Sequence, residues 1–451
     1  MPVGKLFGTD GIRGVANTEL TPELALALGR ALVGTLRERG IDRPRVLIGL
    51  DPRASGDMIQ AALASGLASA GGDVTELGVV PTPGVAYLTL ETRADAGAVI
   101  SASHNPVGDN GIKFFGADGY KLNDAQERRV EELLEGERVD RPTGVDLGRV
   151  ERPVDVLAPY RDHLVAASAG VRADGLEVVV DCANGAASDL APQVLAALGA
   201  NVEAIHAEPN GRNINAGCGS THPEPLREAV RRRGADLGLA HDGDADRLIA
   251  VDEAGRVVDG DQLLAIFATR LRAERGLDTV VTTVMTNLGF KLAMQREGIA
   301  VEETKVGDRF VLEAMRRGGH LLGGEPSGHL IFADQATTGD GILSAVRLLT
   351  TMTETGCKLS ELATVMEQLP QVLVNVRGVD RDRLGAAEGV WGAVRDEEAA
   401  LDGRGRVLVR ASGTEPLVRV MVEADSETSA RDAADRVAER VVAELGGEPD
   451  G

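Results

Sequence analysis

The chain has 451 residues, of which 43% are hydrophobic and only 2% aromatic, and it carries a net charge of −22. This length predicts three or four domains, whose cores must consist mainly of Val, Leu, Ile and Ala, as is usual in α/β layers. The negative charge argues against nonspecific binding to nucleic acid or to an anionic membrane, because the field of the protein repels polyanions. An anionic small substrate would therefore need a locally basic pocket.

The sequence contains neither a run of 18 apolar residues nor the apolar segment of a signal peptide, so we expect a soluble, cytoplasmic protein. Cys182, Cys218 and Cys357 are scattered, without the spacing of a metal site. We therefore interpret them as reduced, mostly structural thiols.

Near the N-terminus, residues 6–14 (LFGTDGIRG) are punctuated by glycine and include Thr9, Asp10 and Arg13. This pattern predicts a loop that offers backbone amides and a cation to a ligand, although a plain glycine-rich turn fits it as well. A helix is expected to begin directly after Thr21.

Three later segments repeat one plan, which consists of a strand, a glycine turn, a helix, a glycine and a second strand. They cover residues 46–77, 178–205 and 280–304. The repetition predicts three related α/β domains, each with a mostly parallel sheet. Right-handed crossovers should place the glycine turns at the carboxyl ends of strands, where α/β proteins bind ligands.

The pattern changes after Pro370, where strands at 372–376, 406–410 and 417–423 precede a closing helix at 427–445. This order predicts a smaller α+β domain, followed from Gly446 by a tail without function. The expected architecture is therefore four domains around a central cleft, with boundaries at 1–155, 156–256, 257–370 and 371–451.

The apolar residues 97–100 predict a buried strand that leads into the polar turn 101–106 (SASHNP). Ser103 is thus expected on rigid structure, within reach of a ligand. A hydroxyl beside an imidazole can act as a nucleophile or carry a phosphoryl group, and His104 can move protons. Taken alone, these residues are more typical of a capped turn.

Residues 242–247 (DGDADR) lie between two apolar strands and place Asp242, Asp244 and Asp246 at alternate positions. Three carboxylates separated by small residues can converge on one hard divalent cation, and without it they repel each other. A calcium EF-hand is an alternative, but Arg247 replaces its sixth-position glycine. A solvated acidic turn is the other alternative. Mg²⁺ is favoured, because the open coordination positions suit a phosphate oxygen.

Residues 323–330 (GGEPSGHL) form another polar turn, with Glu325, Ser327 and His329. A carboxylate beside a hydroxyl can bind the vicinal hydroxyls of a sugar. His329 could donate a proton or contact phosphate, and a purely structural histidine is the alternative.

Residues 410–416 (RASGTEP) follow a predicted strand, and Arg419 lies on the next one. Arg410, hydroxyls and successive backbone N–H groups are the components of a phosphate site. An ordinary turn with surface arginines is the alternative. Together, the four polar loops suit phosphoryl transfer between a protein serine and a phosphosugar.

These loops, in this order, closely resemble those of the α-D-phosphohexomutase superfamily, and the resemblance covers nearly the whole chain. It includes the N-terminal segment 7–14 (FGTDGIRG). Further short motifs look like the phosphoglucosamine branch of the superfamily: 209–211 (PNG), 213–215 (NIN), 218–222 (CGSTH) and 338–341 (TGDG). Pro326 departs from that branch, which commonly has a polar residue there.

The resemblance implies that Ser103 is a phosphoserine and that it binds one Mg²⁺ together with Asp242, Asp244 and Asp246. It also implies roles for residues that handle the phosphoryl group and the sugar. Catalytic roles would fall to His104, Lys113 and Arg247, and substrate binding to Thr9, Arg13, Glu325, Ser327, His329, Arg410, Ser412, Gly413, Thr414 and Arg419.

The activity that this resemblance implies is the interconversion of glucosamine 6-phosphate and glucosamine 1-phosphate, with glucosamine 1,6-bisphosphate as intermediate and activator. Phosphoglucomutase or phosphomannomutase activity, a phosphosugar phosphatase and a noncatalytic sugar-phosphate sensor are the alternatives. The expected partner is a small phosphosugar rather than nucleic acid or a membrane, and a homodimer is left open.

Overall fold

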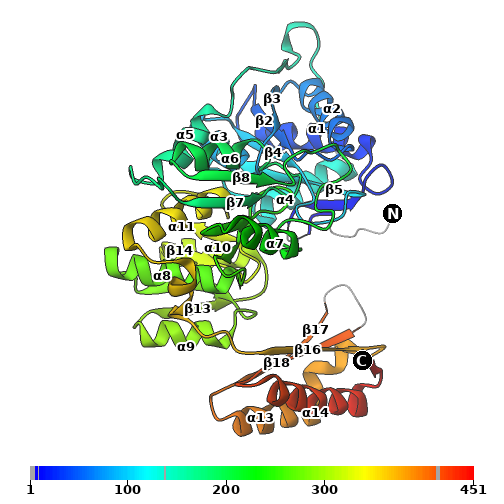
Figure 1. Ribbon diagram of the computed structural model, residues 1–451. Helices are drawn as coiled ribbons and strands as arrows, with labels where there is room; N and C mark the ends of the chain where they lie inside the picture. Colours follow the sequence, from blue (N-terminus) through cyan, green and yellow to red (C-terminus); the bar gives the residue numbers. More distant parts are fainter. Residues whose placement is uncertain (1–5, 9, 137–138, 413–416, 451) are drawn as a thin grey trace. The chain divides into compact units, whose positions relative to one another are not determined.

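The computed structural model describes residues 6–8, 10–136, 139–412 and 417–450 (Figure 1). The chain forms two compact units. Unit 1 comprises Met1–Met285 and Ile299–Thr364, and unit 2 comprises Thr286–Gly298 and Val365–Gly451. No helix in the described part of the chain combines the length and hydropathy that a bilayer crossing requires.

The first sheet of unit 1 has six strands in the order β1-β5-β4-β2-β3-β6. Strands β2, β3, β4 and β6 run parallel, whereas β5 and β1 are antiparallel to their neighbours. The strands are β1 (Ile12–Val15), β2 (Arg45–Leu50), β3 (Asp73–Val79), β4 (Ala96–Ile100), β5 (Asp109–Gly116) and β6 (Val150–Glu151). The accompanying helices are α1 (Pro22–Glu38), α2 (Gly56–Ser69), α3 (Thr82–Glu91) and α4 (Asp124–Glu135).

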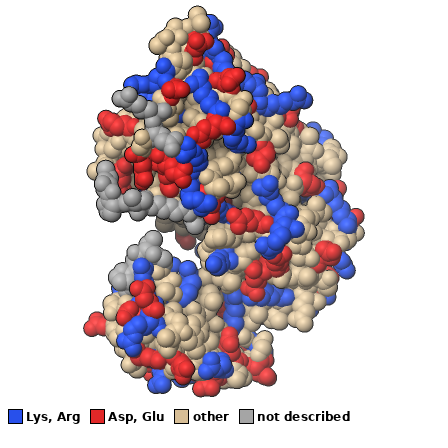
Figure 2. Space-filling view, turned by 180° about the vertical axis from the view of Figure 1, so that it is seen from behind, with Lys and Arg blue, Asp and Glu red and all other residues tan. Residues whose placement is uncertain are grey.

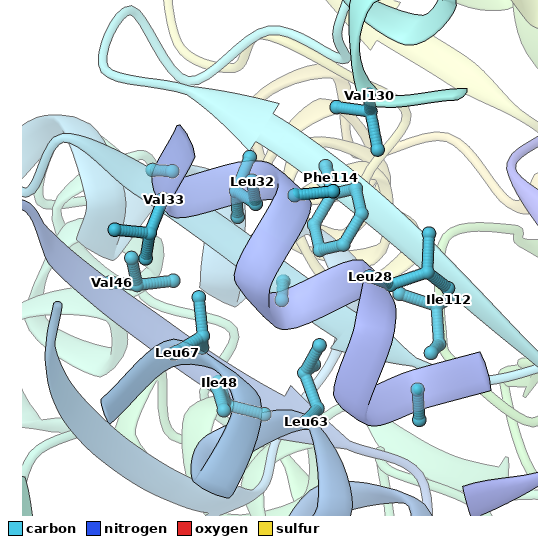
Figure 3. Packing of buried hydrophobic residues seen from close by; sticks show 14 of the residues in the cluster. Leu28, Leu32, Val33, Val46, Ile48, Leu63, Leu67, Ile112, Phe114 and Val130 are labelled. Carbon is cyan, nitrogen blue, oxygen red and sulfur yellow. The ribbon is translucent and has the colours of Figure 1, made fainter. Parts of the chain in front are cut away.

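The core beside this sheet is aliphatic, as the composition predicts. Leu28 and Leu32 of α1 pack beside Leu63 of α2 and Ile48 of β2 (Figure 3). The two helices approach closely at Gly66, where an added Cβ would lie 2.1 Å from the carbonyl oxygen of Leu26. A larger residue at Gly66 would therefore push α1 and α2 apart, because backbone atoms cannot yield as a flexible side chain does.

The second sheet has the order β11-β10-β9-β7-β8 and the third has the order β13-β12-β14-β15. The second contains β7 (Glu177–Asp181), β8 (Asn201–Ile205), β9 (Leu237–Ala240), β10 (Ile249–Asp252) and β11 (Val257–Val258), with helices α5 (Ala158–Ala166), α6 (Leu190–Ala197) and α7 (Glu224–Arg233). The third contains β12 (Thr279–Thr283), β13 (Ala300–Thr304), β14 (Leu322–Gly324) and β15 (Leu330–Phe332), with helices α8 (Gly260–Arg275), α10 (Asp308–Gly318), α11 (Gly341–Thr355) and α12 (Leu359–Leu362).

One strand order recurs in all three sheets. It reads β3-β2-β4-β5 in the first, β8-β7-β9-β10 in the second and β13-β12-β14-β15 in the third. In each case the first three strands are parallel and the fourth is antiparallel. The loop before the antiparallel strand therefore occupies the same place in each sheet, at the carboxyl ends of the parallel strands.

Unit 2 contains a four-stranded antiparallel sheet in the order β17-β18-β16-β19. Its elements are α9 (Leu288–Arg296), β16 (Gln371–Arg377), α13 (Glu388–Leu401), β17 (Arg406–Ala411), β18 (Leu417–Glu423), α14 (Glu427–Leu445) and β19 (Glu448–Pro449). Together with the three sheets of unit 1, this smaller domain confirms the predicted fold class.

Helix α9 was expected as the crossover of the third repeat, yet it belongs to unit 2. The N–H of Leu288 donates to Glu423 Oε2 at 2.7 Å, and Asn287 Nδ2 donates to the carbonyl oxygen of Leu369 at 3.0 Å. The chain therefore enters unit 2, returns to unit 1 and enters unit 2 again.

Two expectations at the chain ends are wrong. The N-terminal loop already contains the start of β1, because Ile12 and Arg13 pair with β5. The C-terminal tail is not a free tail, because Glu448 and Pro449 pair with Arg377 and Val376 of β16. Short pairings of this kind leave little trace in the sequence, since a two-residue strand has no detectable alternation.

Candidate active site

The three polar motifs of unit 1 occupy the equivalent loops of the three sheets. Residues 101–108 connect β4 to β5, residues 241–248 connect β9 to β10, and residues 325–329 connect β14 to β15. The glycine turns stressed by the sequence pattern follow the first strand of each repeat, whereas these motifs follow the third parallel strand. The same edge of each sheet therefore presents a different set of functional groups.

Ser103 is buried and has a φ of 50°, a left-handed conformation that is uncommon for serine. Its N–H donates to Ser101 Oγ at 2.9 Å, and Ser101 Oγ donates to Asp51 Oδ2 at 2.6 Å. These bonds help to hold the backbone in this conformation. The Ser103 hydroxyl donates to Asp242 Oδ2 at 2.5 Å, so the first and second loops meet at the two residues that the sequence singled out.

The fully buried guanidinium of Arg53 holds the first loop, which contains Ser103, through hydrogen bonds. Arg53 donates to the carbonyl oxygens of Ser103 at 2.9 Å and Asn105 at 2.8 Å, and to that of Asp109 at 3.0 Å. Its Nε forms a salt bridge with Asp51 Oδ2 at 2.9 Å. One side chain thus donates hydrogen bonds to several carbonyl groups of the same loop.

Asn215 supports the same loop from the second domain. Its Nδ2 donates to the carbonyl oxygens of Ser103 at 2.8 Å and Asn105 at 3.2 Å. Neither role was predicted from the sequence, where Asn215 stands in a branch motif and Arg53 in the turn after a strand. An arginine two residues after a strand-ending aspartate was the available signal.

Asp242, Asp244 and Asp246 are all buried, and one carboxylate oxygen of each lies within 4.8 Å of the others. Within the described part of the chain, the Oδ1 atom of each is buried without a hydrogen-bond partner. Burial, together with the charges of Asp246 and Asp244, raises the pKa of Asp242 well above its usual range. Three oxygen ligands left open at one point fit a hard cation such as Mg²⁺. The flanking elements are strands, so the EF-hand alternative is wrong.

The small residues of the second loop allow it to approach the first. A Cβ at Gly243 would lie 2.5 Å from the carbonyl oxygen of Ser103. The N–H of Thr82 donates to the carbonyl oxygen of Asp244 at 3.0 Å, and Thr82 Oγ1 donates to Asp244 Oδ2 at 2.7 Å. The glycine is therefore required by backbone contact, and the carboxylates are positioned by groups from outside their own loop.

Lys113 on β5 lies between two carboxylates. Its Nζ is 3.1 Å from Asp244 Oδ2 and 3.1 Å from Asp10 Oδ2. Burial opposes its charge, but Asp10 and Asp244 outweigh burial and raise the pKa of Lys113. In this arrangement the ammonium group stays charged.

Lys121 and Asp308 extend this network and were missed by the sequence analysis. Lys121 Nζ is 2.6 Å from Asp10 Oδ1 and 2.5 Å from Asp308 Oδ2. Asp308 opens α10 directly after Gly307, which has a φ of 128°. Gly307 and Asp308 follow the strand at 300–304. A polar residue beside a glycine after a predicted strand is the pattern that pointed to the other polar loops, so Asp308 could have been predicted in the same way.

His104 and Arg13 flank the first loop. His104 Nδ1 lies 3.3 Å from Ser103 Oγ. Burial, together with the positive charges of Arg247 and Arg13, lowers the pKa of His104 to about 4, so the ring is neutral near pH 7. Arg13 forms an ion pair with Asp10 and lies 3.4 Å from Asn105 Oδ1.

Arg247 and His329 bring positive charge to the carboxylates. Arg247 Nε lies 3.7 Å from Asp246 Oδ1, and within the described residues it has no hydrogen-bond partner. His329 Nδ1 lies 3.4 Å from Asp246 Oδ2, and its Nε2 lies 3.6 Å from Asp308 Oδ2. Burial disfavours the charged ring, but the two carboxylates prevail and raise the pKa of His329 to about 9.

The remaining groups of the third loop are partly buried. Glu325 Oε1 accepts a hydrogen bond from the N–H of Gly307 at 3.1 Å, and burial raises the pKa of Glu325. Ser327 Oγ is buried and, as far as the structure describes the chain, lacks a hydrogen-bond partner. A carboxyl and an open hydroxyl are suitable contacts for sugar hydroxyls.

In unit 2, Arg410 of β17 and Arg419 of β18 are directly opposite each other. Partial burial and the charge of Arg419 lower the pKa of Arg410. Opposed like charges on neighbouring strands are unfavourable, and a bound anion would relieve them. Ser412 is buried, and its carbonyl oxygen accepts from Arg381 Nη1 at 2.7 Å. Thr9, Gly413 and Thr414 lie outside the described residues.

Elsewhere on the surface, charged side chains of both signs are mixed. On the face seen in Figure 2, Lys and Arg side chains are interspersed with Asp and Glu and form no continuous basic surface.

Four family models match the chain in sequence order, all described as phosphoglucomutase/phosphomannomutase. Domain I matches residues 4–140, domain II residues 158–255, domain III residues 259–369 and the C-terminal domain residues 373–440. The chain belongs to the phosphoglucomutase/phosphomannomutase family. This family lies within the α-D-phosphohexomutase superfamily, so the resemblance expected from the sequence is confirmed, and the chain is a phosphohexomutase, which is an isomerase.

Individual members of the family align over nearly their full length. A protein from Saccharopolyspora erythraea named phosphoglucosamine mutase is 56% identical over 444 residues, which cover 98% of this chain and 100% of that protein. One of the same name from Symbiobacterium thermophilum is 54% identical over 446 residues, which cover 98% and 99%. A family structure from Burkholderia thailandensis has a TM-score of 0.84 at 25% identity and covers both chains completely.

Proposed function

We propose that this phosphohexomutase interconverts glucosamine 6-phosphate and glucosamine 1-phosphate. The substrate rests on the similarity to relatives named phosphoglucosamine mutase, several of which are 54 to 56% identical over nearly the full length. The chemistry rests on one contact, between the Ser103 hydroxyl and the buried carboxylates that begin with Asp242. A phosphate on Ser103 would therefore lie beside the proposed cation site of the three carboxylates.

In the proposed reaction, Ser103 carries the phosphoryl group that enters the sugar. The bond between Ser103 Oγ and phosphorus breaks, a bond from the oxygen of the free sugar hydroxyl to phosphorus forms, and the proton of that hydroxyl ends on Ser103 Oγ, which regains its O–H. The resulting glucosamine 1,6-bisphosphate reorients, and its other phosphate returns to Ser103. This bisphosphate therefore serves as intermediate, and as activator when the serine has lost its phosphate.

Asp242, Asp244, Asp246 and Ser103 would hold one Mg²⁺, which when bound would neutralise charge on the phosphoryl group. The open Oδ1 atoms of the three carboxylates support this assignment. Arg247 supplies further positive charge beside them. Lys113, a charged group held by Asp10 and Asp244, is better suited to stabilise negative charge than to accept a proton.

The neutral ring of His104 has its Nδ1 3.3 Å from Ser103 Oγ, and we assign it to the surroundings of the phosphate. The sugar hydroxyls are assigned to Glu325 and Ser327. His329, positively charged between two carboxylates, is placed to contact the phosphoryl group or to donate a proton. The phosphate that is not transferred would bind through Arg410, Ser412, Gly413, Thr414 and Arg419 of the second unit. Thr9 and Arg13 are assigned to substrate binding.

We also propose a cytoplasmic location. Free Cys182, Cys218 and Cys357 agree with the reducing cytoplasm, where disulfides are rare. We leave a homodimer open as the working form.

The decisive experiment combines mass spectrometry, which locates the phosphate on the protein, with measurements of turnover. Peptide mapping before and after incubation with glucosamine 1,6-bisphosphate and Mg²⁺ should place one phosphate on Ser103. Ser103→Ala should then lose phosphorylation and turnover, whereas Ser65→Ala on the exposed face of α2 should retain both. Phosphate on another residue would refute the covalent scheme.

Comparing the turnover of glucosamine, glucose and mannose 6-phosphates tests the substrate separately. Pro326, beside Glu325, departs from the phosphoglucosamine branch, and a phosphoglucomutase or phosphomannomutase is the alternative within the superfamily. A preference for glucose or mannose would establish that alternative, and phosphate release faster than isomerisation would establish a phosphatase.

A further inference from the structure

A second cluster of metal-binding side chains lies at the same edge of the second sheet. Asp181 is the last residue of β7, His206 directly follows the adjacent parallel strand β8, and Cys218 comes from the loop that leads to α7. One ligand atom of each lies within 4.8 Å of the others. The spacing of 25 and 12 residues gave no metal signal in the sequence, because the fold alone brings the three together.

The ligand atoms of this Asp181–His206–Cys218 cluster are oriented by neighbouring groups. Asp181 Oδ1 accepts from the N–H of Ala183 at 2.9 Å, and Oδ2 accepts from the N–H of Gly219 at 3.0 Å. Asn184 Nδ2 lies 3.9 Å from Cys218 Sγ, a weak N–H···S contact. Outer partners of this kind fix the ligands of protein metal sites.

The geometry around Asp181 is compatible with a shared ion. His206 Nδ1 lies 3.0 Å from Asp181 Oδ2, slightly less than the roughly 3.3 to 3.6 Å between two tetrahedral ligands that lie about 2.0 to 2.2 Å from one zinc ion. Asp181 and Cys218 are buried, whereas about a third of the His206 side chain is exposed. An ion can therefore reach the cluster from the His206 side, and three protein ligands leave a fourth position open.

The donor types separate this cluster from the carboxylate cluster of Asp242. Three carboxylates form an oxygen site, which suits Mg²⁺. One thiolate, one imidazole and one carboxylate form a mixed site, which suits Zn²⁺ or a similar thiophilic divalent ion and disfavours Mg²⁺. We propose that Asp181, His206 and Cys218 bind one Zn²⁺ per chain, at a site separate from that of Mg²⁺. On binding, the thiol releases its proton to solvent.

This site is connected to the phosphoserine loop. The N–H of Asn215 donates to the carbonyl oxygen of Ala183 at 2.9 Å, and its side chain donates to that of Ser103 at 2.8 Å. Zn²⁺ would therefore link the segment at the end of β7, which contains Asp181 and Ala183, to the segment from His206 to Cys218, which contains Asn215. The expected consequence is a more rigid support beneath Ser103.

Co²⁺ serves as the probe, because Co²⁺ bound to a thiolate has a charge-transfer band in the near ultraviolet and Co²⁺ bound to carboxylates alone does not. The full chain is titrated with Co²⁺ under saturating Mg²⁺ and a phosphine reductant. One equivalent should produce the band, Zn²⁺ should abolish it, and Zn²⁺ should raise the melting temperature.

Cys218→Ser should abolish the band, and His206→Gln should weaken Co²⁺ binding at least tenfold. Cys357→Ser is the matched control and should retain the band, since Cys357 lies outside the cluster. Circular dichroism and turnover verify folding, and the partly exposed His206 provides a second variant if Cys218→Ser is unstable. Absence of the band, its persistence in Cys218→Ser or its loss in Cys357→Ser would each refute the proposal.

Discussion

The loops that carry Ser103 and Asp242 occupy the same place in related sheets, yet they are held in opposite ways. Side chains hold the Ser103 loop, because Arg53 and Asn215 donate to its carbonyl groups. Main-chain contacts dominate around the Asp242 loop, which packs through Gly243 against the carbonyl group of Ser103. The sheet therefore fixes where a loop lies, whereas the local hydrogen bonds and backbone contacts fix which atoms remain open for a ligand.

Neutralising one carboxylate should have the largest effect on activity. In Asp242→Asn, we expect turnover to fall by more than the roughly 10- to 100-fold that changes beyond the metal ligands cost. Without Mg²⁺ the same variant should melt no lower than the parent chain, because it removes repulsion among buried carboxylates. Steady-state kinetics and thermal melts in a chelating buffer measure the two effects. A lower melting temperature together with normal turnover would contradict the proposed role of the carboxylates as a cation site.

Removing the guanidinium of Arg53, which holds the Ser103 loop, should mainly affect the stability of the fold. Arg53→Met leaves Asp51 charged and buried without its partner, which costs on the order of 3 to 5 kcal/mol. Denaturant titration measures this change in the free energy of unfolding. Adding Asp51→Asn to Arg53→Met should recover part of the loss, and no recovery would show that Arg53 acts through the carbonyl groups alone.

Asp340, directly before α11, provides a test of how stability depends on pH. Burial raises the pKa of Asp340 to about 6, above its reference value of 3.8. The protonated form is therefore favoured by folding, and the stability it contributes is complete below pH 4 and lost as pH rises through 6. The loss approaches roughly 3 kcal/mol.

Asp340→Asn is neutral throughout and keeps the acceptor for the N–H of Leu343. It should therefore gain stability relative to the parent chain between pH 4 and pH 7. Melting curves across this range measure the difference, and parallel curves for the two proteins would contradict the assignment.

The smallest change tests the contact between the loops directly. Gly243→Ala adds one methyl group, whose carbon would lie 2.5 Å from the carbonyl oxygen of Ser103. Overpacking of this kind costs about 1 to 3 kcal/mol, and we expect a larger relative loss in turnover because the two loops must move apart. The matched control is Gly108→Ala, where an added Cβ meets no atom within 4 Å. Equal loss of turnover in both variants would contradict the contact.

The sequence was sufficient to predict the fold class and to locate the polar loops that follow the third parallel strands, because both depend on local patterns. The strand before Ser103 is apolar, and the aspartates of the second loop alternate with small residues. Arg53 and Lys121 could not be predicted in the same way, because their roles depend on partners tens to almost two hundred residues away. The same holds for Asp181, His206 and Cys218, whose proximity follows from the order of β7 and β8.

The position of α9 sets an order of events during protein synthesis. Helix α9 leaves the ribosome long before Glu423, which accepts the hydrogen bond of Leu288 and follows it by 135 residues. At 5 to 20 residues per second, the delay is on the order of ten seconds. During that time β12 and β13 can pair with each other, whereas α9 still lacks its contact with Glu423 at the end of β18. A nascent chain that is halted before the last strands would therefore expose α9 to solvent and to proteases.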